Sequence, residues 1–299
     1  MSNAALSAGL CFLLCVSLLT GWVVGKGIKA PEDVIESSVA WVDKTIRYQF
    51  RVQNTRPEVM KSVDVTVYAP SHIEGRQHVQ SVTANYDFSS MSSGWGNDEL
   101  HFVFDQIAPF GSKQIIVTAQ ISLPVSAAPV LLDEKALYLR EEPYIELSDE
   151  AIRKQATSLA TPVAGSTVSG IYNWLIDHVV DDGLTMADKG ASYALDTGRG
   201  DCTEFMYLFS ALARLNNIPT RNLGGFVLAQ NGILRATAYH NWAEYFLDGR
   251  WHIADAQRQV LDDEYESYVI MRSLTSSGDR AKHSERFVSF TPGLKLTMD

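Results

Sequence analysis

The sequence predicts an α+β fold in which an N-terminal antiparallel β-sandwich is followed by an α+β domain. Three observations lead to this prediction. Apolar and polar residues alternate in short segments between residues 37 and 123, apolar residues recur at helical spacing after residue 148, and Asp248-Gly249 separates two aromatic-rich segments. Alternation with a period of two is typical of half-buried strands, whereas spacings of three and four residues are typical of helices with one buried face.

The first 30 residues are predicted to be a membrane anchor or a signal segment. Residues 1–25 carry no charged side chain, and the apolar residues 10–24 approach the roughly 20 that span a bilayer. No cleavage motif with small residues is evident, so we expect an uncleaved anchor with the remainder outside the cytoplasm, in the periplasm or at the cell surface. Lys26 and Lys29 follow the apolar run, and by the positive-inside rule they favour the opposite orientation.

Residues 31–123 are predicted to form the β-sandwich, of about the size of an immunoglobulin domain. Turn-rich stretches such as residues 89–94 separate the strands, and no cluster of reactive side chains stands out, so we expect a spacer or substrate-docking module. The alternating apolar positions are Tyr48, Phe50 and Val52; Val63, Val65 and Val67; Phe102 and Phe104; and Ile115, Val117 and Ala119. A proline-containing linker, residues 124–147, follows.

Residues 148–299 are predicted to form the α+β domain. We expect a helix capped by Ser148 and ending at Leu159, a second helix over residues 166–180, and a loop over residues 181–196. A third helix begins at Cys202, where Asp201 and Glu204 have the spacing of a capping box. The pattern in residues 258–299 is mixed and predicts no role.

Cys202 is the one cysteine beyond the N-terminal apolar segment. In the first turn of a helix, unpaired N–H groups and the positive end of the macrodipole favour a thiolate. A lone cysteine is most often a small buried hydrophobic residue. Because this one follows a helix cap, we favour a nucleophile, and a free thiol in an oxidising compartment supports a functional use.

A short hairpin is predicted to bring His240 and Asp255 together. The segments 240–247 and 250–255 are rich in strand-forming aromatics, and the two-residue Asp248-Gly249 turn pairs Leu247 with Arg250. In that register His240 lies diagonally across from Asp255 on one face, within reach of an imidazole–carboxylate hydrogen bond. Either residue alone is more often structural, and a slip of one residue would separate them.

Together these residues give a thiol nucleophile, an imidazole that takes its proton and a carboxylate that orients the imidazole. At these positions the sequence resembles the transglutaminase-like superfamily, a papain-related group that includes transglutaminases, bacterial cysteine proteases and peptide N-glycanases. The matching motifs are Gly200-Asp201-Cys202, residues 208–214, residues 218–221, His240-Asn241-Trp242-Ala243-Glu244, and Asp255. The resemblance covers about residues 150–260 and implies a papain-related α+β domain.

The resemblance implies that Cys202 is the nucleophile, His240 the general base and then acid, and Asp255 the orienting group. We therefore expect a cysteine-dependent enzyme that transfers acyl groups from peptide or amide bonds through a thioester. Hydrolysis by a protease or amidase is favoured, and protein cross-linking by a transglutaminase is the alternative. The superfamily also contains inactive members, so a noncatalytic peptide-binding module remains a further alternative.

Three other residues are supporting candidates. Trp242 and Glu244 share the predicted face of His240. The alternative interpretation is that Trp242 is a core residue and that Glu244 is a structural partner of Arg214 or Arg221. Tyr193, in the expected loop, is a candidate for substrate contact.

The formal net charge of −10 argues against nucleic acid or an anionic membrane surface as a partner. We expect a protein or peptide substrate, with membrane contact through the N-terminal segment alone. The remaining histidines have no partner at a recognised metal-ligand spacing, and no EF-hand loop is present, so no metal ion or other cofactor is predicted.

Overall fold

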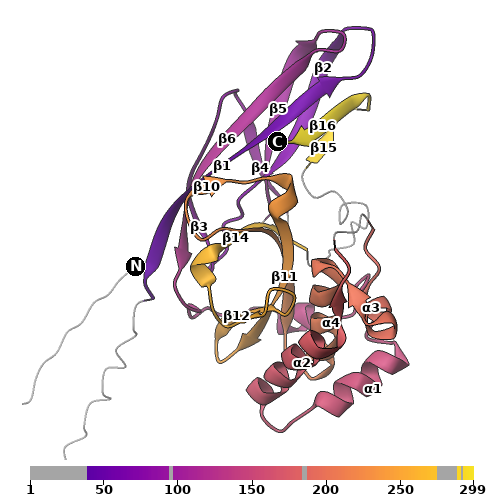
Figure 1. Cartoon of the computed structure of the whole chain (residues 1–299). Helices are drawn as coiled ribbons and strands as arrows, with labels where there is room; N and C mark the ends of the chain where they lie inside the picture. The colour runs from indigo at the N-terminus through magenta and orange to yellow at the C-terminus, as the bar shows by residue number, and fades with distance from the viewer. Residues whose placement is uncertain (1–38, 94–96, 184–186, 275–287, 291) are drawn as a thin grey trace, which may run out of the picture. The chain divides into compact units, whose positions relative to one another are not determined.

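The computed structural model describes residues 39–93, 97–183, 187–274, 288–290 and 292–299 (Figure 1). Val39–Asp299 form one compact unit. The predicted N-terminal anchor or signal segment lies outside the described residues, and among the residues that are described no helix is long and apolar enough to cross a membrane. Antiparallel sheets and four α-helices in the described ranges confirm the α+β class.

The predicted sandwich is present as two sheets that share one hydrophobic core. The first contains β1 (Trp41–Asn54), β3 (His78–Ala84), β6 (Ser112–Pro124), β10 (Gly232–Ile233) and β16 (Leu294–Met298). The second contains β2 (Met60–Ala69), β4 (Ser89–Ser93), β5 (Asn97–Ile107) and β15 (Val288–Phe290). The alternating apolar side chains predicted on β1, β2, β5 and β6 are buried in this core.

Two features of the sandwich differ from the sequence prediction. Residues 89–93, expected in a turn, form β4 and pair with β5, because a partner strand supplies the hydrogen bonds that a serine-rich segment does not predict by itself. Strands from beyond residue 230 also complete both sheets, since β10 and β16 pair with β1 and β15 pairs with β2. The domain boundary at residues 124–147 stays a prediction.

A third, antiparallel sheet carries most of the remaining strands, in the order β13 (Val260–Leu261), β12 (Arg250–Asp255), β11 (Tyr239–Leu247), β9 (Thr220–Val227) and β14 (Tyr268–Ser273). Helix α4 (Cys202–Leu215) packs against β9 and β11. Around it lie α1 (Glu150–Leu159), α2 (Ala164–His178) and α3 (Ala191–Thr197), and Figure 1 shows the four helices gathered beside this sheet. Residues 202–214 are all buried, so α4 is a central helix held on every side.

Short elements connect these layers. Strands β7 (Val180–Asp181) and β8 (Arg199–Gly200) form a parallel pair that precedes α4. The 3-10 helices are η1 (Lys135–Tyr138), η2 (Ala236–Ala238) and η3 (Tyr265–Ser267).

Helices α1 and α3 correct two predictions. The cap of α1 is Asp149, which accepts hydrogen bonds from the N–H groups of Ala151 and Ile152, while Ser148 donates to Glu141 instead. The predicted loop 181–196 contains most of α3, and Tyr193 therefore lies on a helix. Seven residues are too few to show helical periodicity clearly, which is why the sequence did not indicate this helix.

A buried ionic cluster joins the sandwich to the third sheet. Glu244, on β11, accepts a hydrogen bond of 2.7 Å from Nε of Arg76, which lies between β2 and β3, and bonds of 2.6 and 2.9 Å from Arg221 on β9. Burial opposes ionisation of Glu244, but the charges of the two arginines outweigh it and lower the pKa of the carboxyl. The cluster thus fixes β11 against two other segments.

We expect Glu244→Gln to lower the free energy of unfolding by about 3–5 kcal/mol, because two buried guanidinium groups lose their counter-charge. Urea denaturation measures this difference. Arg51→Met is the matched control, since Arg51 is exposed in its ion pair with Asp299 and should change stability little. A Glu244→Gln protein as stable as the wild type would contradict the role of the cluster.

Candidate active site

The N-terminus of α4 fixes Cys202. Asp201 accepts a hydrogen bond of 2.8 Å from the N–H of Thr203, and Glu204 accepts one of 3.1 Å from the N–H of Asp201, which confirms the predicted capping box. Gly200 is required beside it, because a Cβ at this position would lie 2.3 Å from Cβ of Glu204. Cys202 is a free, buried cysteine in the first helical turn. Backbone N–H groups there have no acceptor within the helix.

The hairpin has the predicted register. Asp248 and Gly249 both have positive φ, as the favoured two-residue turn requires, and Leu247 pairs with Arg250. His240 Nε2 lies 2.6 Å from Oδ2 of Asp255, so the predicted hydrogen bond is present. Both side chains are buried, and the pair is therefore shielded from competing water.

The surroundings of His240 favour its protonated form. Burial alone would lower its pKa, but hydrogen bonds with Asp255 and Cys202, together with the charges of both groups, raise the pKa to about 9. Since Nε2 is engaged by Asp255, Nδ1 is the nitrogen left for the thiol. The structure thus brings Cys202, His240 and Asp255 together in an arrangement that can hold a proton next to a sulfur nucleophile. Their catalytic roles stay predictions at this point.

Two residues that the sequence did not indicate hold Asp255. Tyr268, on β14, donates a hydrogen bond of 2.8 Å to Oδ2, and the N–H of Arg258 donates one of 3.2 Å to Oδ1. The Arg258 guanidinium in turn donates to the Tyr268 hydroxyl at 2.9 Å. Both residues lie in the segment 258–299, to which no role was assigned. Their side chains are polar, but no local pattern indicates that they face Asp255.

Trp242 packs beside His240, and Glu244 forms the ion pairs described above; a supporting role for either residue stays a prediction. The Trp242 ring is buried, lies nearly parallel to the His240 ring at 6.4 Å between centroids, and meets Tyr268 edge-on at 5.0 Å. It therefore packs behind the imidazole. Glu244 pairs with Arg221, one of the two predicted partners, whereas the other, Arg214, pairs with Glu142.

Tyr193 is not brought to the triad by any of its described contacts. Lys189 donates to its hydroxyl at 3.3 Å and also lies over its ring, and its carbonyl oxygen accepts from Thr197. A role for Tyr193 in substrate contact stays a prediction.

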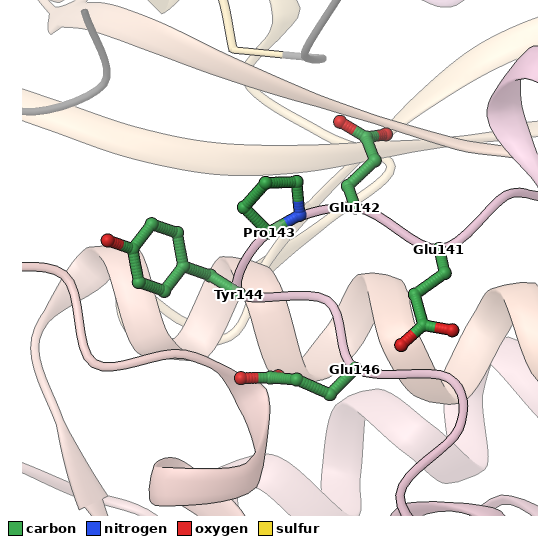
Figure 2. A pocket seen from close by; sticks show the side chains of 5 residues that line it. All are labelled: Glu141, Glu142, Pro143, Tyr144 and Glu146. Atoms are coloured by element: carbon green, nitrogen blue, oxygen red, sulfur yellow. The ribbon is translucent and has the colours of Figure 1, made fainter. Parts of the chain in front are cut away.

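A pocket apart from the triad lies in the linker, and Figure 2 shows the carboxylates that line it. Its lining is Glu141, Glu142, Pro143, Tyr144 and Glu146. All three carboxylates have partners: Glu141 accepts from Ser148, Glu142 accepts from Arg214 at 2.7 Å, and Glu146 accepts from the first N–H groups of α3. These contacts anchor the linker to the helices, and the lining includes none of the three triad residues.

Comparison with known proteins concerns the segment that contains Cys202, His240 and Asp255. Residues 150–256 match the model of the transglutaminase-like superfamily. The resemblance predicted from the sequence is therefore confirmed: this segment is a transglutaminase-like domain. No curated protein matches the chain.

Solved structures are similar to this chain at low sequence identity. A candidate cysteine protease from Cytophaga hutchinsonii is 16% identical, with a TM-score of 0.58 over 87% of this chain and 92% of the other. The similarity extends beyond the matched domain and shows that the fold of most of the chain is shared. The periplasmic domain of TgpA from Pseudomonas aeruginosa, bound to ethylmercury, is 14% identical, with a TM-score of 0.38 over 74% of this chain and 93% of the other.

Replacing Asp255 by Asn should lower the pKa of His240 from about 9 by at least about one unit. The charge that favours the imidazolium is removed while burial, which disfavours it, remains. An NMR titration of the His240 ring measures the shift. Asp262→Asn is the control, because it removes the carboxylate partner of His252 instead and should leave His240 unchanged. Titration of His240 near pH 9 in Asp255→Asn would contradict the assignment.

Proposed function

We propose that this protein is a cysteine-dependent acyl-transfer enzyme that cleaves peptide or amide bonds, with Cys202, His240 and Asp255 as its catalytic residues. The observation that carries the proposal is the imidazole of His240, held at 2.6 Å by Asp255 and interacting with a thiol at a capped helix N-terminus. A buried histidine with a purely structural role does not need a carboxylate on one side and a cysteine on the other.

In the proposed reaction the Cys202 thiolate attacks the carbonyl carbon and a C–S bond forms. The oxyanion that develops is stabilised by the backbone N–H of Cys202 at the helix start. The C–N bond then breaks as His240 gives its proton to the leaving amine, and a thioester remains. A water molecule that loses a proton to His240 attacks the thioester, and the C–S bond breaks. The carboxylic acid product leaves, and the Cys202 thiolate and the His240 imidazolium are restored. Asp255 keeps the imidazole in one orientation throughout.

We propose water, rather than a second amine, as the acceptor, and a peptide or protein outside the cytoplasm as the substrate. The fold shared with the candidate cysteine protease from Cytophaga hutchinsonii supports a protease. The uncharged residues 1–25, with their apolar run at residues 10–24, support placement outside the cytoplasm, either as an anchor or as a signal segment. The acidic net charge supports a polypeptide rather than a nucleic-acid substrate.

Cys202 should be alkylated by iodoacetamide at a pH well below the value of about 8.5 at which free cysteine ionises. The rate is measured from about pH 4 to 9 by mass spectrometry of the tryptic peptide that contains Cys202, which separates it from Cys11 and Cys15. His240→Ala should lose the reactivity at low pH, whereas His252→Ala should keep it. An inert thiol, or equal rates in wild type and His240→Ala, would argue against the triad and leave a noncatalytic peptide-binding module.

Cleavage of a denatured protein substrate should fall at least about 1,000-fold in Cys202→Ala. The assay contains a fluorescent primary amine, so that peptide release and amine incorporation are measured together. Release without incorporation is the expected result. If amine incorporation exceeds peptide release, the protein is a cross-linking transglutaminase rather than a protease. If the thiol is reactive but neither product forms, the protein is a noncatalytic peptide-binding module.

A further inference from the structure

Three possible metal ligands meet in the loop that follows β2 and at the first residue of β3. His72, Glu74 and His78 each place one ligand atom within 4.8 Å of the others. The sequence did not predict this cluster, because the H-x5-H spacing of His72 and His78 is only half of a recognised zinc motif and no pair of cysteines accompanies it. They meet because the chain forms a tight hairpin here. None of the three triad residues belongs to this hairpin.

The register of that hairpin explains why the side chains converge. Ile73 and Gln77 exchange two backbone hydrogen bonds, of 2.8 and 2.9 Å. His72 and His78 are the next residues outward, so they form a pair without backbone hydrogen bonds, the type in which opposite Cα atoms are only about 4.5 Å apart. Their rings are stacked, with centroids 5.3 Å apart. Gly75 permits the turn with a φ of +70°, and a Cβ there would lie 2.2 Å from Val130 Cγ1.

Hydrogen bonds of the Gln77 side chain fix the backbone that carries these ligands. The Gln77 side chain, which is fully buried, donates to the carbonyl oxygens of Ser71 and Ile270 at 2.9 and 2.7 Å and accepts from the N–H of Ile270 at 2.8 Å. The His78 ring lies on that of Trp41, with centroids 4.1 Å apart. Only the outer ends of the ligand side chains therefore need to move when an ion binds.

We propose that His72, Glu74 and His78 form a binding site for a divalent metal ion of the zinc class. Two imidazole nitrogens and one carboxylate oxygen are ligands that zinc accepts, and a water molecule can fill a fourth position. Calcium prefers six to eight oxygen ligands, which this set does not offer. Tetrahedral zinc, with bonds of about 2.0–2.1 Å, places its ligand atoms about 3.4 Å apart. Rotation of the exposed His72 and Glu74 side chains can shorten the present distances between the ligand atoms, which are at most 4.8 Å, to this value.

The position of this site gives it a structural role. The same hairpin carries Arg76, which reaches inward to Glu244 on β11, the strand of His240. An ion held by residues on both arms of the hairpin opposes its opening and so keeps Arg76 in place. Metal binding should therefore stabilise the junction between the sandwich and the third sheet, without taking part in bond cleavage.

Zinc binding to the full chain tests the proposal by isothermal titration calorimetry. Cys11→Ser, Cys15→Ser and Cys202→Ala are introduced together so that no thiol competes for the ion. We expect one zinc ion per chain, and an affinity at least about tenfold lower in His72→Ala, His78→Ala and Glu74→Gln. His101→Ala is the matched control, because His101 also contacts a carboxylate, Asp64, on the same sandwich, and it should bind as the parent does.

Thermal unfolding gives a second readout. Zinc should raise the Tm of the parent and of His101→Ala, but not that of the three ligand variants. In EDTA, Glu74→Gln should share the Tm of the parent, because it is an isosteric change at an exposed position. This variant keeps the test decisive if a histidine variant loses stability together with its ring stacking. Absence of stoichiometric binding, or equal binding in parent and ligand variants, would overturn the proposal.

Discussion

The register of the β11–β12 hairpin is the constraint on which the site depends. Asp248 and Gly249 adopt positive φ, so the turn holds two residues and Leu247 lies opposite Arg250. Every later pairing follows from this one, including the approach of His240 to Asp255. Side chains alternate between the two faces of a strand, so a slip of one residue would move His240 to the face packed against α4 and separate the pair. A turn at the far end of the hairpin thus determines the geometry of the His240–Asp255 pair.

Buried ion pairs then fix the hairpin relative to the rest of the molecule. Arg214 joins α4 to Glu142 in the linker, and Glu244 joins β11 to Arg76 and Arg221. Such pairs add little net stability compared with apolar packing, because desolvation offsets their attraction. They do penalise any arrangement in which one partner is left without the other. Since each connects segments far apart in the chain, they restrict the packing of sandwich, linker and third sheet to arrangements that keep the triad residues close.

The features that the sequence predicted are those set by neighbouring residues. The capping box before Cys202, the two-residue turn and the alternating strands each depend on a few adjacent positions, and the structure contains all of them. The features that it missed depend on partners elsewhere in the chain. Strand β4 needs β5, and the support of Asp255 by Tyr268 needs β14 to lie beside β9. The meeting of His72 and His78 is an exception, because it follows from one local hairpin register.

The raised pKa of His240 has a consequence for the proposed reaction. Burial disfavours the imidazolium, and Asp255 and Cys202 together overcome that effect. Once a thioester forms, the sulfur no longer carries negative charge, so one of the two groups that raise the pKa is lost while burial remains. The pKa of His240 should then fall, and the imidazole becomes able to accept a proton from water at the step where a base is required. Asp255, held by Tyr268 and Arg258, stays in place during this change. Formation of the intermediate can therefore switch the same histidine from acid to base without movement of the backbone.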